Sequence, residues 1–107
     1  MAKGFDMNQL MKQAQQMQEQ MAKVQEELAQ ETVEASAGGG MVVVKATGAG
    51  ELASITIDPK AIDPDDPELL EDMVLAAANE ALRSAQSLAQ SKLNAATGLG
   101  GLGLPGL

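Results

Sequence analysis

The chain has no cysteine, histidine, tryptophan or tyrosine, and Phe5 is its single aromatic residue. Without cysteine, disulfides and thiol chemistry are excluded. Without histidine, the commonest acid–base group and the commonest metal ligand are missing, and a histidine-based triad cannot form. No hydrophobic run reaches the length of a membrane span, and no signal-peptide pattern is present. We therefore expect a cytoplasmic protein that is not an enzyme, with no catalytic residues, metal, cofactor, small-molecule substrate or membrane contact.

Basic residues are also scarce. Seven Lys and Arg stand against fifteen Asp and Glu, which gives a net charge of −8. This balance argues against nucleic acid as a partner, because phosphates attract Lys and Arg. The acidic residues are concentrated, however: residues 1–25 carry a balance of +1, residues 26–72 one of −10 and residues 73–107 one of +1. The middle of the chain is therefore acidic and both ends are weakly basic.

The length of 107 residues indicates one domain. We assign residues 1–97 to that domain and predict that the Gly/Leu-rich segment 98–107 is a flexible tail. Apolar residues make up 45% of the chain, but many of them are alanine. Small domains bury a low share of their surface, so we expect a second copy of the chain to complete the core.

The most regular pattern in the chain predicts a long helix from about Asp6, a suitable N-cap, to about Gln30. Apolar side chains recur in it at spacings of three and four, which is typical of a helix that packs against another helix. We expect this seam to pack against the second long helix, in the same chain or in a dimer mate. The seam residues are Met7, Leu10, Ala14, Met17, Met21, Val24 and Leu28.

The middle of the chain alternates in the manner of strands. Strands are predicted at residues 32–37, 41–47 and 52–58, and the glycine turns 38–40 and 48–50 connect them into an antiparallel meander. We expect one face of the sheet to point toward the second helix. Its residues are Val42, Val44, Ala46, Ala53, Ile55 and Ile57.

The second helix is predicted from about Pro67 to Asn94. Asp66 can cap it and proline suits its first position. The surrounding acidic residues suit helix capping better than a cation site, because an EF-hand spacing is missing. The resulting order of helix, three strands and helix is that of an α+β domain with an antiparallel sheet.

Short segments along the chain carry a further signal when taken together. They are Leu10–Gln18, Met41–Lys45 after the glycine turn, Ile57–Pro59, Leu70–Val74, Ala77–Ala81 and Leu104–Gly106. In order and spacing they resemble the YbaB/EbfC family of bacterial nucleoid-associated proteins. The resemblance implies a homodimer whose paired helices project like the arms of tweezers. It also implies binding of double-stranded DNA in the nucleoid with low sequence specificity, a change in DNA conformation, and roles in gene regulation, nucleoid organisation and DNA protection.

Candidate DNA contacts follow from this resemblance, although a glutamine-rich face is ordinarily only solvated surface. Glutamine offers both a donor and an acceptor to phosphates and base edges. An antiparallel pair of helices would bring the start of the first beside the end of the second, so that the basic residues meet at the arm tips. The competing hypothesis is a protein-interaction adaptor that uses the acidic middle and the Met-rich helix. The candidate DNA-binding residues are Lys3, Gln9, Lys12, Gln16, Lys23, Arg83 and Lys92.

Overall fold

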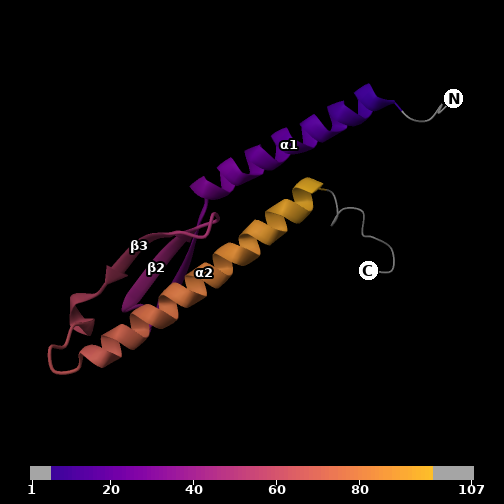
Figure 1. The fold of residues 1–107 in the computed structure, drawn as a ribbon. Coiled ribbons are helices and arrows are strands. Elements are labelled where there is room, and N and C mark those ends of the chain that lie inside the picture. The colour runs from indigo at the N-terminus through magenta and orange to yellow at the C-terminus, as the bar shows by residue number, and fades with distance from the viewer. Residues whose placement is uncertain (1–5, 98–107) are drawn as a thin grey trace, which may run out of the picture.

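The computed structural model describes residues 6–97, and it has the predicted α+β order (Figure 1). Lys3 and the predicted tail 98–107 lie outside the described residues. The last helix continues three residues beyond the predicted end at Asn94. The elements are α1 (Met7–Gln30), β1 (Thr32–Ala37), β2 (Val42–Thr47), β3 (Leu52–Ile57), the 3-10 turn η1 (Pro59–Ala61) and α2 (Pro67–Thr97).

Aspartates begin the helical elements, and the sequence predicts two of these caps, Asp6 and Asp66. The Asp6 carboxylate accepts hydrogen bonds from the backbone N–H groups of Asn8 at 3.0 Å and Gln9 at 3.4 Å. The Asp58 carboxylate accepts from the N–H of Lys60, and the Asp66 carboxylate from the N–H of Leu69. Because the first N–H groups of a helix lack partners within it, these carboxylates satisfy them.

The three strands form an antiparallel sheet in the order β1-β2-β3. Val42 pairs with Ile57 and Val44 with Ile55, but a register shift follows, so that Ala46 pairs with Leu52. The prediction that Ala53 points inward with Ile55 is therefore wrong. The extra residue of a β-bulge changes the alternation of a strand, and Leu52 takes the place opposite Ala46.

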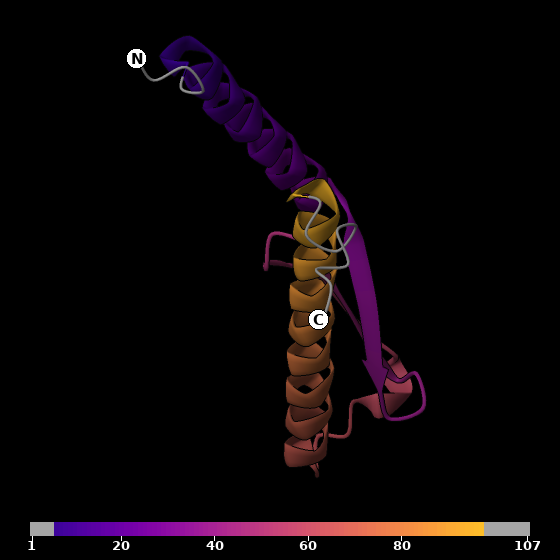
Figure 2. The ribbon, with the colours of Figure 1, turned by 90° about the vertical axis from the view of Figure 1, so that its right-hand side faces the viewer.

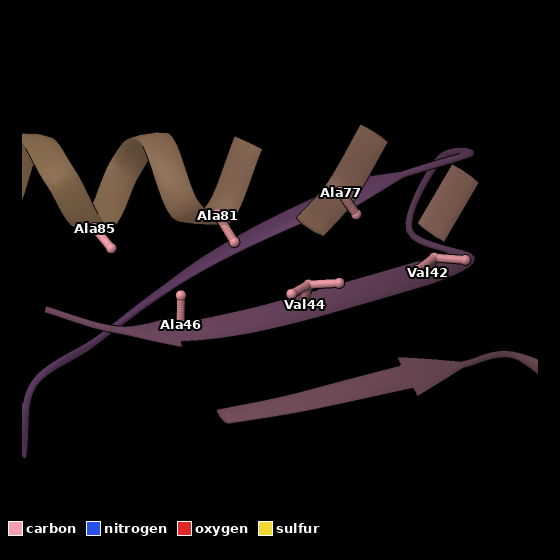
Figure 3. Close-up of a cluster of buried hydrophobic side chains, with 6 residues drawn as sticks. All are labelled: Val42, Val44, Ala46, Ala77, Ala81 and Ala85. Carbon is pink, nitrogen blue, oxygen red and sulfur yellow. The ribbon is translucent and has the colours of Figure 1, made fainter. Parts of the chain in front are cut away.

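The core lies between α2 and the first two strands. Val42, Val44 and Ala46 of β2 are fully buried against α2. Figure 3 shows side chains of α2 pointing toward this strand. The residues that α2 contributes are Ala77, Ala81 and Ala85, spaced by four.

This close approach of α2 leaves β3 at an uncovered edge of the sheet. Alanine side chains let a helix lie near a sheet, and α2 packs mainly on β1 and β2. Ile57 is half-buried against the core, as predicted, whereas Ile55 is 45% exposed. The expectation that Ile55 packs under the second helix is therefore wrong for this chain.

Only the last turns of α1 pack within the chain. Val24 is buried and Leu28 is 1% exposed, whereas Met7 is 59% and Met17 55% exposed. Figures 1 and 2 show the N-terminal half of α1 projecting away from α2. The predicted seam of α1 thus meets α2 only near the C-terminal end of α1. Neither of the helices in residues 6–97 combines the length and apolar character needed to cross a bilayer.

Candidate nucleic-acid interface

The C-terminal end of α1 is held by the turn between β2 and β3. Gly48 is buried in that turn, and its N–H donates a 2.9 Å hydrogen bond to the carbonyl oxygen of Glu31. A Cβ atom at Gly48 would lie 2.7 Å from Leu28 Cδ2 and 2.8 Å from the Leu28 carbonyl oxygen. Glycine is therefore required where the turn supports α1.

One side of the projecting helix is a polar face, which we define as Gln9, Lys12, Gln16 and Lys23. All four are exposed. Since each residue of an α-helix is rotated by about 100° about the helix axis, these four positions lie within about 60° of one another around the axis. They extend over about 21 Å of the helix length. Glu19 lies on the same side, so the face carries two ammonium groups, one carboxylate and two amides. Such a row can donate hydrogen bonds to an extended polyanion.

Another side of α1 carries an apolar stripe, whose side chains lie in the open because α2 does not reach them. Met11, Ala14, Met17 and Met21 line a shallow open groove there, together with Gln15 and Gln18. Met7 and Leu10 continue the exposed apolar surface toward the N-terminus. The projecting helix is thus amphipathic, with its apolar side available for packing.

Lys92, a residue of α2, lies beside the C-terminal end of α1, whereas Lys12 lies near the N-terminal end of α1. The ammonium group of Lys92 forms ion pairs with Glu31 and, at 3.7 Å, with Glu27. The side chain is 28% exposed. The hydrogen bond to Glu31 raises the pKa of Lys92, against the opposing effect of desolvation, and the charges of Glu31 and Glu27 raise it further.

Within one chain, the predicted meeting of basic residues at one arm tip is therefore wrong. Glu27 is fifteen residues from Lys12, so Lys92 is about 22 Å from Lys12 along α1. Arg83 is exposed and pairs with Glu80 of its own helix at 3.1 Å. The reason is that α2 ends beside the last turns of α1, and α1 continues alone.

The pairing of Lys92 with Glu31 could not be found from the sequence. The two residues are 61 positions apart, and no local spacing connects them. Asp58 caps η1, and the Asp63 carboxylate accepts from the N–H of Asp65 in the turn that follows. The described residues contain no group of three or more acidic side chains placed to hold a metal ion.

The fold and its surface define a two-layer α+β protein with a projecting amphipathic helix, a shape suited to binding a large polar partner. The model of the YbaB/EbfC DNA-binding family matches residues 3–101, and this chain belongs to that family. The resemblance expected from the sequence is confirmed.

Relatives of this chain match over almost their whole length. A nucleoid-associated protein of Thermoanaerobacter pseudethanolicus is 57% identical over 104 residues, which cover 97% of this chain and 92% of the relative. One of Saccharopolyspora erythraea is 52% identical over 109 residues, which cover 95% and 94%. The crystal structure of the uncharacterized protein HP0035 from Helicobacter pylori aligns with a TM-score of 0.72 over 81% of this chain and 91% of that chain. At 24% identity, that structure shows a shared fold.

Proposed function

We propose that this protein is a nucleoid-associated protein that binds double-stranded DNA through the polar face of α1. The observation that carries the proposal is the exposed row of Gln9, Lys12, Gln16 and Lys23 on a helix that projects from the body. Family membership supplies the class of ligand. The proposed location of the protein is the cytoplasm, where it associates with the chromosome in the nucleoid.

The size of the polar face fits a short stretch of duplex. Its length of about 21 Å corresponds to about six base-pair steps of 3.4 Å along the duplex axis. Two lysines contact few phosphates, so binding should be weakly salt-dependent. Glutamine amides can contact phosphates as well as base edges, which agrees with low sequence specificity.

The negative charge of the body favours approach of DNA to the projecting helix. Residues 26–72 carry a balance of −10, and most of them belong to the sheet and the connections around it. Phosphates are repelled by this part and approach the projecting helix instead. Lys45 and Lys60 lie within the acidic segment, so we assign them no role in binding.

We also propose a homodimer, because one chain leaves apolar surface uncovered. Ile55 and Leu52 are exposed on the uncovered edge strand β3, and the apolar stripe of α1 lies open. A second copy can cover both surfaces and would present two polar faces to one duplex. Two such arms could hold DNA at two points and change its path.

The test compares two pairs of substitutions that change the charge equally. Lys12→Gln with Lys23→Gln should weaken binding to plain duplex DNA in a gel-shift assay at low salt, for all sequences alike. The slope of log affinity against log salt should become shallower by about 0.9 for each phosphate that is no longer neutralised. Lys45→Gln with Lys60→Gln is the matched control and should change little. Equal weakening by both pairs would show that binding follows total charge instead of the polar face.

The exposed apolar stripe supports a second candidate function, a protein-interaction adaptor. Methionine-rich surfaces adapt to varied partners. The two functions differ in one measurement: an unmodified, folded dimer that gives no gel shift even at low salt would favour the adaptor.

A further inference from the structure

The joint between α1 and the body is a single residue, Glu31. α1 ends at Gln30 and β1 begins at Thr32. The N–H of Glu31 donates to the carbonyl oxygen of Glu27 at 3.1 Å, and its own carbonyl oxygen accepts from Gly48. Its carboxylate pairs with Lys92 of α2. Both backbone polar groups and the side chain of this joint are therefore engaged.

Small rotations at this joint are large at the end of the helix. From Leu28, the last buried seam residue, to Met7 the helix extends over about 32 Å. A rotation of about 10° at the base moves the N-terminal end by about 5.5 Å, which exceeds the rise of about 3.4 Å along the duplex axis from one phosphate of a strand to the next. The polar face can match a duplex only if the angle of α1 is restrained.

Lys92 is placed to supply such a restraint. Its ammonium group joins Glu27 in the last turn of α1, Glu31 at the joint, and α2 of the body. A phosphate approaching Lys92 would be repelled by the two carboxylates beside its ammonium group. Its surroundings therefore favour an ion pair within the protein over one with DNA.

We propose that Lys92, Glu27 and Glu31 form a polar clamp that sets the angle at which the DNA-binding helix leaves the body. Lys92 is in this view a positioning residue and does not bind phosphate. The inference rests on the proposed function for its effect on DNA, but the clamp itself can be measured without DNA.

The first experiment measures the arm angle directly. The chain has no native cysteine, so Gln20→Cys on α1 and Ser87→Cys on α2 provide two exposed sites for nitroxide labels. Double electron–electron resonance is recorded on labelled chains mixed with an excess of unlabelled chains. We expect one narrow distance distribution in the parent, and a broader or displaced one with Lys92→Gln. Lys92→Arg should keep the parent distribution, and so should Arg83→Gln, which removes a cation from the same helix.

The second experiment uses the sign of an effect on DNA binding. If Lys92 touched phosphate, Glu31→Gln would strengthen binding by removing a competing carboxylate. The clamp predicts the opposite, binding several-fold weaker than that of Glu34→Gln, a control that removes an equal charge from an exposed site in the acidic segment, with recovery when Lys92→Glu is combined with Glu31→Lys. It also predicts that Lys92→Gln weakens binding without changing the salt slope, whereas a lysine that neutralised one phosphate would make the slope shallower by about 0.9 when replaced.

The outcomes separate the two proposals. An unchanged distance distribution with Lys92→Gln, at unchanged far-ultraviolet circular dichroism, overturns the clamp whatever DNA does. DNA binding by Glu31→Gln that is as strong as or stronger than that of the equal-charge control Glu34→Gln overturns it as well. Absence of DNA binding by the parent protein overturns the proposed function, while the distance measurement still decides the clamp.

Discussion

Gly48 offers the most direct test of how the body holds α1. We predict that Gly48→Ala destabilises the protein by loosening the end of this helix. The added methyl group would lie 2.7 Å from Leu28 Cδ2 and 2.8 Å from the Leu28 carbonyl oxygen. Carbon atoms prefer separations of about 3.5–4.0 Å, so the turn or the helix must move by most of an ångström.

The cost can be estimated from what is able to move. Leu28 is 1% exposed, so its side chain has no open space to enter, and the carbonyl oxygen belongs to the helix backbone. Overpacking of this kind costs about 1–3 kcal/mol. For a domain of this size each kcal/mol lowers the melting temperature by about 4–8 °C. We therefore expect a decrease of about 5–20 °C.

Thermal unfolding followed by circular dichroism, at one protein concentration for all variants, measures this effect. Gly50→Ala is the matched control in the same turn: no atom lies within 4 Å of its added Cβ, but its φ of 90° is unfavourable for alanine. It reports the cost of backbone strain alone and should leave the distance between labels on α1 and α2 unchanged. A Gly48→Ala variant that melts with the parent and keeps the parent label distance would refute this account of how the turn supports α1.

Three further predictions concern the sheet and Lys92. Ile57→Asp places an unpaired charge against the core and should cost about 3 kcal/mol or more; unchanged urea unfolding would contradict the observed register. Ile55→Lys alters a side chain that is exposed in one chain, so it should weaken the dimer in sedimentation while the fold persists; an unchanged association constant would place the interface elsewhere. The pKa of Lys92 is raised in the folded state from its ordinary value of 10.5. Its ion pairs therefore stabilise the folded protein fully at pH values below 10.5, and this stabilisation is lost as the pH rises through the pKa of the folded state. Lys92→Gln should accordingly flatten the decline in stability above about pH 10.5, and an identical decline in both proteins would argue against the pairing.

Much of the fold was predictable because its signals are local. Asp6 and Asp66 accept hydrogen bonds from N–H groups two or three positions away, so the helix starts could be predicted from neighbouring residues. Glycine turns separated the strands, and alternation identified Val42, Val44 and Ala46 as one buried face. The order of segments along the chain was also enough to predict the family.

The candidate site was predictable only in part. The polar face of α1 follows from helical spacing alone, because residues three, four and seven apart share a side. That this face lies on a projecting helix does not follow from spacing, since the apolar seam of α1 could have packed along the whole of α2. The β-bulge that brings Leu52 opposite Ala46 depends on how β3 pairs with β2, and no composition rule specifies that.

The sequence by itself determined the elements, the starts of the two long helices and the amphipathic character of α1, because each depends on residues within a few positions. Only the tertiary structure decided where α1 points and which charges remain available. The alanine face of α2 settles over β1 and β2 and leaves β3 exposed, and α2 ends beside the last turns of α1. Lys92 is consequently neutralised by carboxylates more than sixty residues away. Such pairings arise from packing, in which small side chains allow close approach and distant segments meet.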